Sequence, residues 1–112
     1  MLAYERLDVY QCAIEFLAVS TTIVGSLPKG HGALGDQLRR AGMSIPLNIA
    51  EAAGKTTAAD RRRFAAIARG SAMECGAILD VCTVLNVATG AEVKRGKALL
   101  VRIVSMLTKM CR

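Results

Sequence analysis

The chain has 112 residues, the length of one ordinary domain, and it is 53% hydrophobic but only 4% aromatic. Its longest uncharged stretch, Phe16 to Pro28, is shorter than the roughly 20 apolar residues that cross a bilayer, and Glu5 and Asp8 do not fit a secretory signal. We therefore expect a soluble, cytoplasmic protein without a membrane segment, folded as a single domain over residues 1–112.

Hydrophobic periodicity predicts a first helix at about residues 5–25 and a second at about 33–53. The first helix carries one stripe of residues at alternating steps of three and four, which we expect to face the core: Leu7, Tyr10, Ile14, Leu17, Thr21 and Val24. A proline and two glycines in the segment 26–32 separate the two helices, and Gly54 is a typical C-terminal stop for the second.

A third helix is predicted at about 57–87 and a fourth at about 90–111. Each begins with a threonine followed three residues later by an acid, Thr57 with Asp60 and Thr89 with Glu92, which is typical of a capped helix start. Four helices joined by short turns predict an all-α fold, an antiparallel up-down four-helix bundle.

The second helix contains the unusual stretch "QLRRAGMSIPLNIAEAAGK", residues 37–55, with a proline inside it. Pro46 removes a backbone donor and crowds the preceding turn, so we expect a kink there. Polar residues flank the core stripe of this helix and face the third helix, and they form a predicted structural network: Ser44, Asn48, Glu51, Ser71 and Glu74. Within it we expect ion pairs from Glu51 to Arg62 or Arg63, and from Arg40 to Glu74.

The positive charge is distributed unevenly. The first 36 residues hold two basic and four acidic residues, whereas the other 76 hold thirteen basic and five acidic ones, giving +6 overall. Arginine outnumbers lysine ten to five, which favours bidentate contacts to phosphate or carboxylate. Nucleic-acid binding with steep salt dependence and little sequence preference is therefore predicted for one group of basic residues: Arg39, Arg40, Lys55, Arg61, Arg62, Arg63 and Arg69.

Catalysis and metal binding are not expected. The chain has no Glu-x-x-His motif of the kind that holds di-iron centres in helical bundles, and its single histidine, His31, lies between two glycines. Its four cysteines form no C-x-x-C pair, so we expect small buried hydrophobic side chains at Cys12, Cys75, Cys82 and Cys111. No cofactor and no metal site is predicted.

Two blocks of sequence, "LRRAGMSIPLNIAEAAGK" and "IARGSAMEC", together with the "ERLDVY" opening, resemble a known bacterial family over essentially the whole chain. These are four-helix-bundle proteins first met as open reading frames in intervening sequences of 23S ribosomal RNA genes. The resemblance implies a ring-like homopentamer. The chain is also similar to the accessory variability determinant of diversity-generating retroelements, which implies partners of two kinds: nucleic acid and a reverse transcriptase.

Two functions remain open from the sequence. The first is a basic, oligomeric, non-catalytic accessory protein that binds RNA or DNA through its arginine clusters. The second is an oligomeric protein-interaction module without nucleic-acid binding, in which the same arginines join acids within or between subunits.

Overall fold

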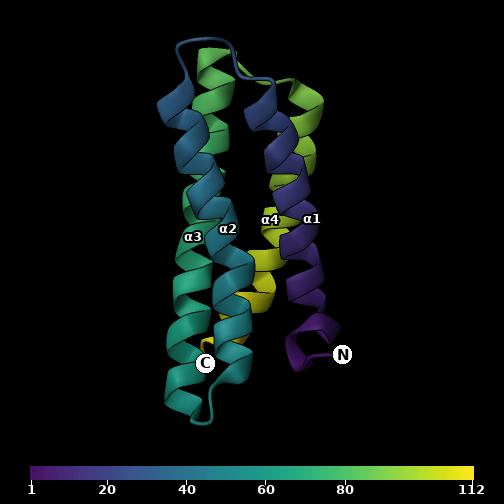
Figure 1. Ribbon diagram of the computed structural model, residues 1–112, viewed down its shortest axis with the longest axis vertical. Helices are drawn as coiled ribbons and strands as arrows, with labels where there is room; N and C mark the ends of the chain where they lie inside the picture. The colour runs from purple at the N-terminus through teal and green to yellow at the C-terminus, as the bar shows by residue number, and fades with distance from the viewer.

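The computed structural model describes all residues, 1–112, and confirms the all-α, antiparallel four-helix bundle. Consecutive helices run in opposite directions, and α1 packs against α4 to close the bundle (Figure 1). A short 3-10 helix precedes the four α-helices, and the elements are η1 (Ala3–Arg6), α1 (Asp8–Gly25), α2 (Gly32–Gly54), α3 (Ala58–Leu85) and α4 (Gly90–Met110). The predicted helix bounds differ from these by no more than three residues.

Side-chain caps fix where α3 and α4 begin. The Thr57 hydroxyl accepts a hydrogen bond from the backbone N–H of Asp60 at 3.2 Å, and the Thr89 hydroxyl accepts one from Glu92 at 3.3 Å. Each cap satisfies one of the backbone donors that a helix start leaves without a partner. At its other end α3 stops at Asn86, which adopts the left-handed conformation with φ of 56°.

The stripe predicted to face the core from α1 is confirmed only in part: Leu7, Tyr10 and Val24 are half-buried and pack against the core, but two other members of the stripe are not buried. Ile14 is 42% exposed and Thr21 is also exposed. The residues of α1 that are buried lie on a neighbouring face: Val9, Cys12, Ala13, Phe16, Val19, Ser20 and Ile23. Because α1 is apolar around most of its circumference, two stripes satisfy the helical period, and the one with the smaller side chains allows the helices to approach more closely.

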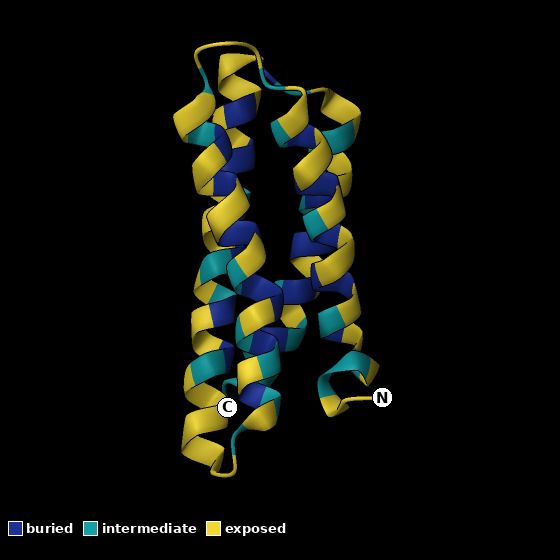
Figure 2. Ribbon diagram, in the orientation of Figure 1, coloured by how far each residue is buried: buried dark blue, intermediate teal, exposed yellow.

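Phe16 is the largest side chain of this core, and it is fully buried where α1 meets its two neighbours. Gly96 of α4 makes room for it, whereas Gly42 of α2 lies at an ordinary contact distance. A Cβ at Gly96 of α4 would lie 3.4 Å from the ring and 3.0 Å from Leu79 Cδ1, and a Cβ at Gly42 of α2 would lie 4.0 Å from the ring. A core with few aromatics is thus closed by bringing a helix backbone near one large ring. Figure 2 shows the buried residues along the inward faces of the helices.

Pro46 lies inside α2 and is buried, and α2 continues through it as one helix from Gly32 to Gly54. Gly42, one turn earlier, faces α1: a Cβ there would meet Ser20 Oγ at 3.2 Å. The glycine therefore serves the contact between the two helices.

The α2–α3 hairpin projects from one end of the bundle. These are the two longest helices, with 23 and 28 residues against 18 for α1 and 21 for α4. The turn between them lies beyond both ends of the chain along the long axis of the 45 × 21 × 21 Å molecule (Figure 1). None of the helices combines the length and the apolar character needed to cross a bilayer.

We expect Gly96→Ala to lower the free energy of unfolding by about 1–3 kcal/mol, because its methyl group must displace buried Leu79 or Phe16. The matched control is Gly70→Ala, where no atom lies within 4 Å of the new Cβ. Because alanine favours the helix more than glycine does, Gly70→Ala should raise the free energy of unfolding by about 0.5–1 kcal/mol. Urea denaturation followed by circular dichroism measures both, and equal effects at the two sites would contradict the close packing described here.

Candidate nucleic-acid interface

Four basic residues gather at the projecting tip of the α2–α3 hairpin, and we call them the hairpin cluster: Lys55, Arg61, Arg62 and Arg63. Lys55 is half-buried just after the end of α2, and the three arginines are exposed on the first turns of α3. Successive residues of an α-helix point about 100° apart, so the three guanidinium groups spread around α3. The cluster thus presents positive charge on several sides of the tip, where Figure 2 shows the start of α3 as exposed.

Within the hairpin cluster only Lys55 touches a carboxylate, through a 3.4 Å contact between its Nζ and Glu51 Oε2. Arg61 Nη1 donates a hydrogen bond to the backbone carbonyl oxygen of Lys55 at 3.3 Å, which holds this arginine across the turn. The side chain of Arg62 forms no hydrogen bond or ion pair with another residue of the chain. All three arginines therefore face solvent without an acidic partner.

Phe64 supports this cluster in a way that the sequence analysis missed. Its half-buried ring lies 4.9 Å from Lys55 Nζ and 5.4 Å from the guanidinium carbon of Arg63. Cations are attracted to an aromatic face at such distances, and the ring gives the two flexible side chains a common support. The run "RRRF" contains the signal, an aromatic residue directly after three arginines.

The other basic residues predicted to join this group lie elsewhere. Arg39 is fifteen residues from Gly54 at the end of α2, which corresponds to about 22 Å along the helix. Arg40, beside it in sequence, is exposed and without an ion pair. Arg69 is half-buried on α3, where its Nε donates a hydrogen bond to Thr108 Oγ1 at 2.9 Å. The predicted group therefore divides into the hairpin cluster and three separate arginines.

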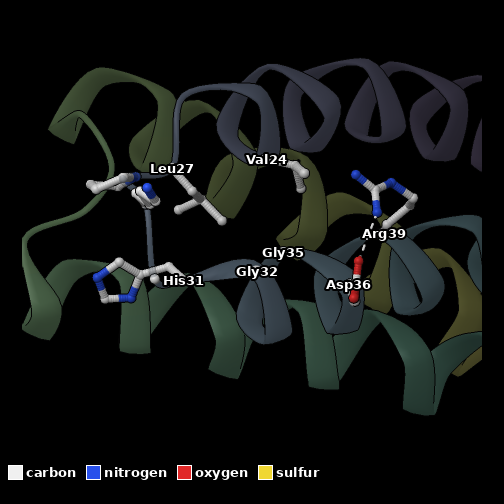
Figure 3. Close-up of a pocket in the computed structure, with 10 residues that line it drawn as sticks. Val24, Leu27, His31, Gly32, Gly35, Asp36 and Arg39 are labelled. Atoms are coloured by element: carbon white, nitrogen blue, oxygen red, sulfur yellow. Dashed lines mark hydrogen bonds and ion pairs between the residues drawn. The ribbon is translucent and has the colours of Figure 1, made fainter.

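Arg39 lines a shallow pocket beside the α1–α2 turn, with a volume of about 320 Å³. The Arg39–Asp36 ion pair, 2.9 Å long, stands at one end and His31 at the other, with Val24 and Leu27 between them (Figure 3). Because the charge of Arg39 is already matched by Asp36, this pocket does not offer the bare positive charge that the hairpin tip does.

A polar network joins α2 to α3 within the hairpin, away from its turn. Asn48 Nδ2 donates to the backbone oxygen of Ser44 at 2.8 Å and to its Oγ at 2.9 Å, and Ser71 Oγ donates to Ser44 Oγ at 2.8 Å. These three half-buried residues link the two helices where their surfaces meet. They fix the register of the hairpin and so the position of its tip.

The ion pairs expected within this network are not formed. Glu51 pairs with Lys55 instead of Arg62 or Arg63, since residues four apart on a helix are neighbours. Glu74 is exposed and forms no ion pair with Arg40. Exposed side chains gain little from such pairs, and spacing alone did not determine which partner each acid takes.

We expect Ser44→Ala to lower the free energy of unfolding by about 1–2 kcal/mol, because Asn48 and Ser71 both lose their hydroxyl acceptor. Glu74→Gln is the control: this exposed side chain has no partner, and the change should stay within about 0.5 kcal/mol. Urea titrations of both variants measure the difference. If Ser44→Ala left the free energy of unfolding unchanged, the network would not be what holds the two helices together.

The remaining titratable side chains include the histidine, the cysteines and the acids. No three His, Cys, Asp or Glu side chains stand close enough together to hold a metal ion. Burial, with a smaller contribution from the charge of Glu74, raises the pKa of the Cys75 thiol to about 12, and burial raises the pKa of Cys82 as well. Both thiols stay protonated near neutral pH, which makes them poor nucleophiles.

Comparison with known proteins gives a family and a fold. Residues 5–109 match the model of a family described as 23S rRNA-intervening sequence protein. A crystal structure of a protein of unknown function, from the S23 ribosomal protein family of Bacteroides thetaiotaomicron, superposes with a TM-score of 0.85. It is 22% identical and covers 93% of this chain and 98% of its own, a likeness that concerns the fold. No curated protein matches the sequence.

Proposed function

The chain belongs to the 23S rRNA-intervening sequence protein family, and we propose that it is a basic, non-catalytic accessory protein of the cytoplasm that assembles with copies of itself and binds RNA or DNA. The hairpin cluster makes the contact. The observation that carries this proposal is the set of three exposed arginines without acidic partners, held at the projecting end of the bundle.

Local helix energetics do not account for these arginines. The N-terminal end of a helix dipole is positive and favours anions, so Arg61, Arg62 and Arg63 gain nothing from their place near the start of α3. Three like charges in sequence also repel one another. An anionic partner removes both penalties, and phosphate is the anion that the guanidinium fork binds best.

The tip favours contact with the nucleic-acid backbone over readout of the bases. Its one aromatic side chain, Phe64, is half-buried and flanked by Lys55 and Arg63, so it does not offer a free face for stacking. Contacts to phosphate carry no sequence information directly. We therefore expect affinity that depends on salt far more than on sequence.

Self-association supports the same function. The mean hydropathy of +0.36 is high for a chain that carries a net charge of +6, and several large apolar side chains are exposed. Copies held together present several hairpin tips to one polyanion, which raises the apparent affinity of each.

The test replaces Arg61, Arg62 and Arg63 together by Gln and measures binding of fluorescently labelled RNA and DNA by anisotropy over a range of salt. We expect affinity to fall at least about tenfold at low salt, and the slope of log affinity against log salt to become shallower by about 2 to 3. Replacing exposed Lys29, Lys94 and Arg102 by Gln is the control, since it removes the same charge from residues without ion pairs outside the hairpin.

Equal losses in both triple variants would show that net charge, and not the hairpin, determines binding. A wild-type protein that binds neither RNA nor DNA at low salt would contradict the proposal and favour the alternative, a module that contacts other proteins.

A further inference from the structure

An apolar pocket of about 340 Å³ lies where the α2–α3 hairpin extends past the two ends of the chain (Figure 1). Five of its six lining residues are apolar and come from three segments: Ala3 and Leu7 near the N-terminus, Ala52 and Ala53 in the last turn of α2, and Met110 at the end of α4. Ala52 is buried and forms part of the floor, whereas the other four are at least partly exposed. Pockets that hold small ligands have volumes of roughly 300–1,000 Å³.

The sixth lining residue is Arg61, which also belongs to the hairpin cluster. Its Nη1 donates a hydrogen bond to the backbone oxygen of Lys55 at 3.3 Å, so the guanidinium is held beside the pocket while its other N–H donors make no bond within the chain. No carboxylate lines the pocket. The larger apolar groove between α3 and α4, of about 420 Å³, shares no residue with the hairpin cluster. The pocket at Arg61 is therefore continuous with the surface to which we assign phosphate binding, and the groove is not.

This arrangement fits a ligand that carries an anion and an apolar, ring-shaped group close together. A nucleotide of a single strand has both, because its base lies one sugar away from its phosphate. An unpaired base can turn into a pocket, whereas a duplex keeps its bases stacked and paired. The thioether sulfur of Met110 makes favourable contacts with aromatic rings. The ring of Phe64 does not take this role, because Lys55 and Arg63 flank it.

We propose that the pocket receives an unpaired base of a single-stranded nucleic acid whose phosphates lie on the hairpin cluster. The inference rests on the proposed function and deepens it, since it names a strand with unpaired bases as the ligand. Arg61, which the phosphate engages, is the one polar side chain of the pocket, so the pocket buries a base without reading its hydrogen-bonding pattern. Affinity then stays weakly dependent on sequence.

The test compares two single strands of equal charge: a strand of about ten thymidine nucleotides, and an abasic strand of the same length that keeps only the sugars and phosphates. Binding is measured by fluorescence anisotropy at low salt. We expect the wild type to bind the thymidine strand roughly three- to tenfold more tightly, because only this strand places a ring in the pocket.

Ala53→Leu fills the pocket and changes no charge. We expect it to lower the affinity for the thymidine strand to that for the abasic strand, while the abasic strand and a fully paired DNA duplex bind as before. The matched control is Ala50→Leu, the same substitution at another half-buried residue of α2 that does not line the pocket. It should leave all three affinities unchanged. Circular dichroism checks that both variants keep the helical content of the wild type.

Equal affinity of the wild type for the two strands would overturn the pocket assignment and leave the hairpin cluster standing. The same conclusion follows if Ala53→Leu, with unchanged helical content, weakens all three ligands equally or still prefers the thymidine strand as strongly as the wild type does. A wild type that binds neither strand would overturn the proposed function and this inference together.

Discussion

The structure depends on the close packing of Phe16 of α1 against Gly96 of α4. With so few aromatic residues, the bundle fills its centre with one large ring, and Gly96 lets the backbone of α4 approach it. This allows Ala, Cys and Ser to serve as core residues along α1 and α3, because closely spaced helices need only small side chains between them. The core thus holds four helices of unequal length in fixed register.

The unequal lengths expose the surface to which we assign a function. The hairpin formed by α2 and α3 extends past the rest of the bundle, and its register is held by Ser44, Asn48 and Ser71. Its tip carries arginines without acidic partners, and it lies apart from the apolar groove between α3 and α4.

The sequence predicted the helices well because caps and breakers are local: Thr57, Thr89 and Gly54 mark bounds that depend on a few neighbouring atoms. It placed the core face of α1 only in part: Ile14 fitted the helical period but is exposed, whereas Phe16 is buried beside Gly96 of α4. It also grouped Arg39 and Arg69 with the hairpin cluster, because charge counts carry no information on which arginines find partners. Those partners, Asp36 and Thr108, are chosen by side-chain geometry.

The most direct test of the central claim is a map of backbone amide shifts by nuclear magnetic resonance as a short RNA is added at low salt. The account predicts that the largest changes fall on residues 55–64, around the hairpin tip, and reverse when salt is raised. Changes centred on the start of α4, around Lys94 and Arg95, or no changes at all, would contradict the assignment of the hairpin as the polyanion-binding surface.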